Sequence, residues 1–450
     1  MQVEQKNVDI VINALKDFYN RILQTGNFNL AEFVNYIEPK FIEAGYRQSS
    51  TSPRFIDKQI NILIICDAGV GDFIIQSATI REIRRLYPDA SITLLITKSL
   101  LNMAECCPYV DKIILSDIKY RHGDFNEMYH QSLSFAEKNL LPRHFDICYA
   151  LALFPLTFFT MYLSGAAHRI ATPIYDDAEE EYAWTATRWI PYNYLINLAN
   201  HIVPRYPLPC HRVDSHLAVV DYFLHAPVAN RKMEIWYTAR DAAVAESYLQ
   251  KATKPIFGFS MASSHPRKCY PPEMYAKVFE MILAEEPTAT FVILGGGQSD
   301  LLQAEKLKNF APEIYAEHII DTTDKISYRQ SAPILKNCDM YIGGDTGTRD
   351  ISAAFNCPVL EITSFPADLP LKPYDIHLIY YPYGVPSVVI QPAHALPECT
   401  NPKLPHNAYG CKVIGKSHCI AQIKPETVFK GFKLLKERIA QKIIEPLYIH

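Results

Sequence analysis

Residues Asn61 to Leu95 read NILIICDAGVGDFIIQSATIREIRRLYPDASITLL. An apolar run leads into a turn with two glycines and an aspartate, and a helical pattern of apolar residues follows. Residues Cys338 to Ile362 repeat this order, with the sequence CDMYIGGDTGTRDISAAFNCPVLEI. In α/β proteins such units place polar groups at the carboxyl ends of strands, where open sheets bind ligands. Two of them, one in each half, predict two Rossmann-like lobes that face a central cleft, and they favour an enzyme.

The chain has 450 residues, of which 49% are hydrophobic and 20% are charged. This composition is typical of a soluble globular protein with two or three domains. The formal net charge of −4 gives no reason to expect nucleic acid as a partner. The first residues, MQVEQKNVDIVINALKDFY, are polar and amphipathic, so we expect no signal peptide and a cytoplasmic location. The eleven cysteines are then expected to be reduced thiols.

One stretch resembles a membrane span, because ICYALALFPLTFFTMYLSGAA, from Ile147 to Ala167, is almost long and apolar enough. However, Pro155 divides it into a strand-like half and a helix-like half. A buried parallel strand that leads into a covered helix has the same hydropathy. We favour that interpretation.

The pattern predicts four segments. Residues 1–58 form a helical N-terminal extension, 59–235 a first lobe, 236–424 a second lobe with a Cys- and Pro-rich tail loop, and 425–450 a helix that packs back across the hinge. The extension is interpreted as helices that pack on the first lobe or on a neighbouring subunit of a homo-oligomer; the alternative is an acceptor-binding device.

The expected elements follow the apolar periodicity. Strands are expected at Ile60–Ile65, Ser91–Ile96, Val110–Leu115, Asp146–Leu153, Pro255–Ser260, Thr288–Leu294 and Met340–Ile342, and helices at Ile74–Tyr87, Val213–Leu224, Pro272–Glu285, Ser331–Asn337, Ile351–Phe355 and Pro425 to about Lys442. The acidic run Asp176–Glu181 is expected to be a solvated loop, and 365–405 a long Pro-rich segment.

The first Gly-rich turn does not complete a dinucleotide fingerprint, since Ile74 stands where the third glycine is needed. Gly69 and Gly71 still allow a tight turn and the close approach of another molecule to the backbone. A carboxylate at Asp72 can act as a general base on an acceptor hydroxyl. The alternative is that Asp72 only caps the helix that follows it, and the spacing does not separate the two.

Two further turns in the second half are candidates for binding phosphate. The segment from Ser260 to Lys268 places hydroxyls and backbone N–H groups beside Arg267 and Lys268, which suits a diphosphate unless it is only a solvated loop. The turn from Gly343 to Thr348 opens a helix, and a helix N-terminus favours an anion.

These stretches, together with CPYVDKIIL, SMASSHPRKCYPPEMYAKV and ECTNPKLPHNAYGCKVIGKSHCIAQIKPETV, resemble glycosyltransferase family 9, the ADP-heptose:lipopolysaccharide heptosyltransferases. The resemblance extends from about Asn61 to Leu435, with the motifs in order. It implies a GT-B fold in which the first lobe binds the acceptor and the second lobe binds a nucleotide-sugar donor.

The resemblance also implies roles for single residues. Asp72 matches the general base, in a turn with Gly69 and Gly71, and Lys268 matches the lysine that contacts the donor phosphate. The remaining donor-binding positions are Ser263, Ser264, Ile326 (near the adenine), Asp345, Thr346, Gly347 and Thr348.

The chain departs from the family pattern beside these positions. Asp350 stands where the family usually has a histidine, and a carboxylate near a diphosphate is unfavourable unless Arg349 or Lys268 offsets it. The aromatic residue of the donor segment is replaced by Cys269-Tyr270.

The tail contains Cys399, Cys411 and Cys419, with His394, His406 and His418 among them. Three thiolates and a nearby fourth ligand could hold a structural metal. A subset that resembles autotransporter heptosyltransferases uses such cysteines for an iron site. Free thiols are the favoured interpretation, and no cofactor is expected in catalysis.

The sequence therefore predicts an inverting transferase that moves a sugar, with heptose from ADP-heptose favoured, to a lipopolysaccharide-core or protein hydroxyl. If the acceptor is a lipopolysaccharide core, we expect peripheral contact with the inner-membrane surface. Two alternatives stay open: a sugar-nucleotide epimerase or hydrolase on the same fold, and an inactive relative that acts as a binding or assembly protein.

Overall fold

The computed structural model describes residues 5–26, 28–47, 60–66, 68–118, 125–151, 155–171, 198–203, 210–263, 265–368, 379–397 and 416–450. The chain forms two compact units. The first contains residues 1–101, 107–208 and 213–231, and the second contains 102–106, 209–212 and 232–450. The acidic run expected to be a solvated loop lies outside the described residues.

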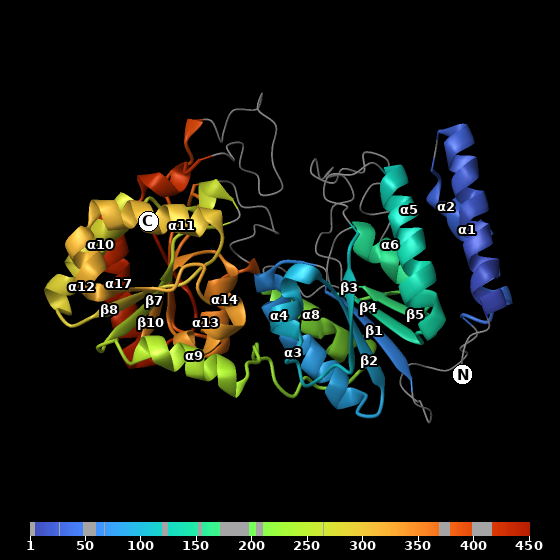
Figure 1. The fold of residues 1–450 in the computed structure, drawn as a ribbon, viewed down its shortest axis with the longest axis horizontal. Helices are drawn as coiled ribbons and strands as arrows, with labels where there is room; N and C mark the ends of the chain where they lie inside the picture. Colours follow the sequence, from blue (N-terminus) through green and yellow to red (C-terminus); the bar gives the residue numbers. More distant parts are fainter. Residues whose placement is uncertain are drawn as a thin grey trace. The chain divides into compact units, whose positions relative to one another are not determined.

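The first unit contains a parallel six-stranded sheet in the order β3-β2-β1-β4-β5-β6 (Figure 1). Its strands are β1 (Asn61–Cys66), β2 (Ser91–Thr97), β3 (Lys112–Ser116), β4 (Ile147–Ala150), β5 (His168–Ala171) and β6 (His201–Ile202). Four of the six residues of β1 are isoleucine or leucine, and they are fully buried, as expected for a parallel strand covered on both faces. The strand order reverses beside β1, which is where doubly wound sheets bind ligands.

The helices of this half of the chain are α1 (Gln5–Thr25), α2 (Leu30–Glu43), α3 (Val70–Leu86), α4 (Leu101–Ala104), α5 (Phe125–Phe135), α6 (Pro155–Leu163) and α8 (Arg212–Ala218). Helix α3 begins at Val70, earlier than the predicted Ile74, because the Gly-rich turn itself supplies the first helical turn. The predicted helix at Val213–Leu224 is confirmed as α8 and a following π-helical turn.

The apolar stretch from Ile147 to Ala167 is a strand followed by a helix, as predicted. Strand β4 is buried along its length, and α6 begins at Pro155, where proline suits the first helical position. Among the residues that the structure describes, no helix is both long and apolar enough to cross a membrane.

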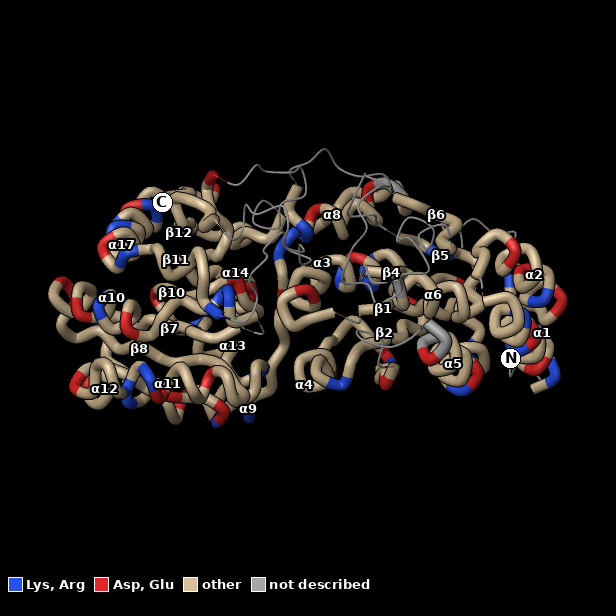
Figure 2. The backbone as a smooth tube through the Cα atoms, turned by 90° about the horizontal axis from the view of Figure 1, so that it is seen from above, with Lys and Arg blue, Asp and Glu red and all other residues tan. Residues whose placement is uncertain are grey.

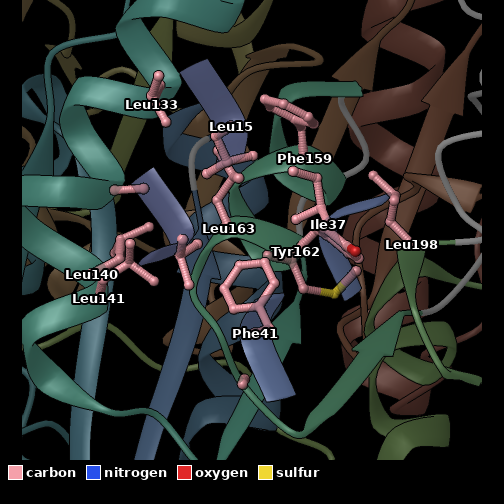
Figure 3. Close-up of a cluster of buried hydrophobic side chains, with 14 of the residues drawn as sticks. Leu15, Ile37, Phe41, Leu133, Leu140, Leu141, Phe159, Tyr162, Leu163 and Leu198 are labelled. Atoms are coloured by element: carbon pink, nitrogen blue, oxygen red, sulfur yellow. The ribbon is translucent and has the colours of Figure 1, made fainter. Parts of the chain in front are cut away.

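The helical extension is part of the core of the first unit. Helices α1 and α2 lie beside α5 and α6, and their apolar side chains enter one buried cluster with those of the lobe (Figures 1 and 3). The ring centroid of Phe33 lies 5.7 Å from that of Phe159 and 5.4 Å from that of Tyr162. The structure thus shows the packing on the first lobe that the apolar stripes predicted.

Polar contacts fasten the same helices. The Tyr129 hydroxyl donates to the Leu15 carbonyl at 3.0 Å. The Arg47 guanidinium lies over two rings, 3.8 Å from the centroid of Phe41 and 4.2 Å from that of Tyr162. Each contact joins the extension to itself or to the lobe, so the extension is expected to unfold together with the first unit.

The second unit contains a parallel seven-stranded sheet in the order β13-β12-β11-β10-β7-β8-β9. Its strands are β7 (Ile256–Ser260), β8 (Thr290–Ile293), β9 (Ile319–Asp321), β10 (Met340–Gly344), β11 (Val359–Ile362), β12 (Ser387–Ile390) and β13 (Leu447–Ile449). Its main helices are α9 (Ala239–Leu249), α10 (Pro272–Glu285), α11 (Gln298–Phe310), α12 (Pro312–His318), α13 (Tyr328–Asn337), α14 (Gly347–Ala354) and α17 (Pro425–Gln441). Figure 2 shows charged residues gathered on helices such as α10, α11 and α17.

Two expectations for this unit need revision. The Pro-rich segment contains a buried strand, β12, which pairs with β11 on one side and β13 on the other. Helix α13 starts three residues early because Ser327 caps it, accepting from the backbone N–H of Gln330. Helix α17 packs on β11, β12 and α10 of the second unit, and its expected packing across the hinge stays a prediction.

We predict that Phe33→Ala destabilises the first unit by about 3–5 kcal/mol, because the ring is fully buried among aromatic neighbours. Leu23→Ala on α1 is the matched control, since that side chain is 56% exposed. Denaturant unfolding of both variants measures the difference. Equal, small losses for the two would show that the extension is not part of the core.

Candidate donor-binding site

The site of the second unit lies where β7 and β10 run side by side. In the strand order, β7 is flanked by β10 and β8, so the order reverses between β7 and β10. Ser260 ends β7, and its partner in the register is Gly343 near the end of β10. The two predicted phosphate-binding turns, which follow these strands, therefore leave the sheet at the position where open sheets bind ligands.

Hydroxyl groups join the two turns. The Ser260 Oγ lies 2.5 Å from the Tyr341 hydroxyl, which is 3.3 Å from Oγ1 of Thr346. Gly343 makes this packing fit, because a Cβ at that position would lie 2.8 Å from the Ser260 carbonyl oxygen and 2.6 Å from the Tyr341 hydroxyl. A side chain there would force the strands apart.

Lys268 and Asp345 form the ion pair at the centre of the site. The Lys268 Nζ lies 2.5 Å from Oδ2 of Asp345, and Nη1 of Arg349 lies 2.9 Å from Oδ1. Each oxygen of the carboxylate thus has its own cation. Burial raises the pKa of Asp345, but Lys268 and Arg349 outweigh that effect and lower the pKa to about 2. Asp345 is therefore ionised at neutral pH.

Arg349 is buried and has two more carboxylates around it. Its Nη2 lies 2.8 Å from Oδ1 of Asp350, and its Nη1 lies 3.1 Å from Oε2 of Glu361 and also donates to the Tyr380 carbonyl. Of the two cations that could offset the charge of Asp350, Arg349 is the one that the structure pairs with it. Burial raises the pKa of Glu361 to about 7, against the opposing effect of Arg349.

Helix α14 begins two residues after Asp345 and contains Arg349 and Asp350. Thr346 is its N-cap residue, and Gly347 and Thr348 form its first turn, where the sequence pattern had predicted the end of a loop. The Thr346 hydroxyl does not cap the helix and instead lies near Tyr341. Backbone N–H groups of the first turn have no acceptor within their own helix, so this end of α14 attracts an anion.

The other predicted donor residues are less closely tied to this centre. Ser263 follows β7 and accepts from the backbone N–H of His265 at 3.4 Å. Ser264 lies outside the described residues. Ile326 is half-buried directly before the Ser327 cap of α13. Its proposed place near an adenine stays a prediction.

Asp72 lies in the first unit, in the first turn of α3. Gly69 is the N-cap residue, and its backbone N–H donates to Oδ2 of Asp72 at 3.3 Å. The capping role that the sequence allowed is therefore present, although the helix begins before Asp72 rather than after it. Gly71 lies within this first turn. Capping does not exclude a second role, because a carboxylate can accept several hydrogen bonds.

Of the tail cysteines, Cys419 alone falls within the described residues, and Cys399 and Cys411 lie outside them. The Cys419 Sγ is buried, 3.3 Å from Nδ1 of His418. Within the described ranges, no group of three His, Cys, Asp or Glu side chains could hold a metal ion. The favoured free thiols and the alternative tail metal therefore both stay untested.

The sequence reasoning missed Glu361 and Tyr341 as members of the site. A signal for Glu361 was present, because a charged residue inside an apolar strand is rarely buried without a partner. Tyr341 gave no comparable signal, since a tyrosine in a buried strand is ordinary. Its role appears only when β10 is placed beside β7.

Comparisons with known proteins agree with this architecture. The family model for glycosyltransferase family 9 (heptosyltransferase) matches residues 183–365. The lipooligosaccharide heptosyltransferase 2 of Haemophilus influenzae is 22% identical over 315 residues, which are 67% of this chain and 83% of that protein. That of Haemophilus ducreyi is 23% identical over 309 residues, 66% of this chain and 81% of its own length.

Solved structures show the same fold. The family 9 glycosyltransferase of Veillonella parvula superposes with a TM-score of 0.60 at 17% identity, covering 84% of this chain and 98% of that one. The E. coli ADP-heptose LPS heptosyltransferase II gives a TM-score of 0.56 at 16% identity, covering 85% and 100%. The fold and the relatives define a glycosyltransferase of the GT-B type. Within that class, the chain is similar to the family 9 heptosyltransferases over the matched residues.

We predict that the stability of the protein falls as pH rises through the titration of Glu361. Its pKa is raised from 4.5 to about 7 on folding. Below the lower value, both folded and unfolded chains carry the proton; between the two values only the folded chain keeps it, so this contribution to stability is lost as pH rises. The melting temperature of the wild type minus that of Glu361→Gln should decrease from about pH 5 to about pH 8.

Glu285→Gln is the control for this titration, because Glu285 is an exposed partner of Lys433. The melting temperature of the wild type minus that of Glu285→Gln should stay constant from about pH 5 to about pH 8. A flat profile for Glu361→Gln as well would contradict the raised pKa.

Proposed function

We propose that the protein is an inverting transferase that moves heptose from ADP-heptose to a hydroxyl of a lipopolysaccharide core or of a protein. The observation that carries the proposal is the pairing of Lys268 with Asp345 at the N-terminus of α14. A cation and unsatisfied backbone N–H groups at a sheet switch point suit the diphosphate of a nucleotide sugar. The two Haemophilus relatives are named as lipooligosaccharide heptosyltransferases, which supports the choice of heptose and of a lipooligosaccharide acceptor.

In this proposal the second unit binds the donor. Lys268 and the backbone N–H groups of Gly347 and Thr348 stabilise the negative charge on the departing diphosphate. Ser263 and Thr346 supply hydroxyls beside the phosphates, and Ile326 packs near the adenine. Because cations and a helix dipole carry the charge, the reaction as proposed needs no catalytic metal. An E. coli heptosyltransferase of the same fold, WaaC, has been solved with ADP.

The first unit would bind the acceptor and supply the base. Asp72 removes the proton from the acceptor hydroxyl, whose oxygen attacks the anomeric carbon of the donor sugar. The bond from that carbon to the diphosphate breaks, and ADP leaves with the electron pair. A single displacement of this kind inverts the anomeric centre. An acceptor in a lipopolysaccharide core would bring the protein, acting in the cytoplasm, to the inner-membrane surface.

A direct test incubates the purified protein with a panel of nucleotide sugars and measures thermal shift and nucleotide release, with and without lipopolysaccharide-core acceptor. The proposal predicts stabilisation by ADP-heptose and release of ADP only when acceptor is present. Release without acceptor would instead indicate a hydrolase. Stabilisation without release under either condition would favour a binding or assembly protein, and no response to any sugar nucleotide would contradict the proposal.

We predict that Asp72→Asn lowers kcat by about 10²–10⁴-fold with little change in melting temperature, because asparagine can still accept from the Gly69 N–H but cannot take a proton. Asp72→Ala should lose both the cap and the activity. Steady-state kinetics and thermal unfolding of the two variants separate the roles. Wild-type kcat in Asp72→Asn would reduce Asp72 to a capping residue.

We also predict that Lys268→Ala raises the dissociation constant for ADP by about tenfold or more, since it removes a charge-assisted contact to phosphate. Lys254→Ala is the matched control, because Lys254 forms an exposed ion pair with Asp339 in the same unit. Calorimetric titration with ADP measures both. Equal affinities in the two variants would remove Lys268 from the donor site.

A further inference from the structure

The buried charges behind Asp345 form one connected network across three elements. Asp345 precedes α14, Arg349 and Asp350 lie within α14, and Glu361 lies on the neighbouring strand β11. The side chains of Arg349, Asp350 and Glu361 are almost completely buried. Lys268, from the turn after β7, closes the network at its more exposed end.

Arg349 is held on several sides. Its Nε and Nη2 donate to Oδ1 of Asp350 at 3.1 and 2.8 Å, and its Nη1 donates to Glu361 at 3.1 Å. A guanidinium is planar and carries its five N–H donors in a fixed fork. With these contacts made, the direction in which Nη1 reaches Asp345 is fixed as well.

Three carboxylates surround Arg349, and the cost of burying its charge explains why it needs several partners. A buried arginine is costly unless it is paired, and removal of one partner of a buried pair is strongly destabilising. Asp350 and Glu361 both pair with Arg349, so Arg349 has partners even when Asp345 is occupied elsewhere. Asp350 is the residue that stands where the resembled family usually has a histidine, and a histidine would bring no negative charge to Arg349.

The Asp345 carboxylate is oriented by the two cations together. One oxygen lies 2.5 Å from Lys268 and the other lies 2.9 Å from Arg349. If Arg349 were shortened, Asp345 would be held from one side only, and the ammonium of Lys268 would lose its fixed partner. The position of Lys268 therefore depends on a guanidinium that it does not touch.

We propose that Arg349 is a positioning residue of the donor site: held by Asp350 and Glu361, it fixes Asp345, and through Asp345 it places Lys268 for the diphosphate. This inference rests on the proposed function of the second unit as the donor-binding unit. It assigns to Arg349 and Glu361 an effect on nucleotide binding that acts only through Lys268.

A double-mutant cycle tests this dependence, with ADP as the probe in calorimetric titrations at one pH and one salt concentration. The variants are Arg349→Lys, Lys268→Ala and the double substitution, with Lys254→Ala as control. Arg349→Lys keeps the charge but loses the fork, so we expect ADP to bind about tenfold more weakly in the Lys268 background. In the Lys268→Ala background the same change should alter the dissociation constant by less than about twofold.

The same factor in both backgrounds would overturn the inference, because Arg349 would then act independently of Lys268. Kinetics provide a second readout. Positioning predicts a raised KM for the donor in Arg349→Lys, whereas a merely structural role would lower the active fraction, and so the apparent kcat, at an unchanged donor KM.

Glu361→Gln provides the same cycle if Arg349→Lys does not fold. Measured at about pH 8, above the raised pKa of Glu361, this substitution keeps Arg349 and removes one of the carboxylates that hold it, so it too should weaken ADP binding only when Lys268 is present. Additive effects of Glu361→Gln and Lys268→Ala would overturn the inference. A wild-type protein that does not bind ADP would overturn the proposed donor site itself, whereas binding with additive effects would overturn only the role of Arg349.

Discussion

The contact between Arg349 and Asp345 is the constraint on which the candidate donor site depends. It joins the turn after β10 to the interior of the second unit, because Arg349 is in turn paired with Asp350 and with Glu361 of β11. On its other side, Asp345 pairs with Lys268 from the turn after β7. The same part of the site also contains the hydroxyl contacts of Ser260, Tyr341 and Thr346.

The network also explains how this chain tolerates an aspartate beside a site for an anion. Two cations and three carboxylates meet there, and a pKa of about 7 for Glu361 means that the network gains a proton near neutral pH. Tyr341 and Tyr448 also lie near Glu361, with their own pKa values raised by burial. Protonation of Glu361 reduces the negative charge of the network at the place where a diphosphate would add more.

The sequence predicted the parts of the fold that follow from apolar periodicity and glycine turns. The central strands β1 and β10 were found because their apolar runs end in glycine turns, and β7 was found from its apolar run. Strand β12 was missed because it is short and lies among prolines, and its place in the sheet is set by its neighbours β11 and β13 rather than by its own pattern. The predicted start of α14 was too late because glycine and threonine are weak helix formers. In the structure these residues form the first helical turn directly after the loop that follows β10.

The candidate site could be predicted as a set of residues but not as a network. Motif resemblance indicated Lys268 and Asp345 at separate positions, and their ion pair follows from the adjacency of β7 and β10, which no local pattern encodes. For Asp72, the structure adds a capping contact without deciding its chemistry. The central claim is that the turns after β7 and β10 bind the diphosphate of a nucleotide donor. A crystal structure of the protein with ADP tests it most directly: the account predicts the β-phosphate beside Lys268 and the backbone N–H groups of Gly347 and Thr348, and a phosphate bound elsewhere in the protein would contradict it.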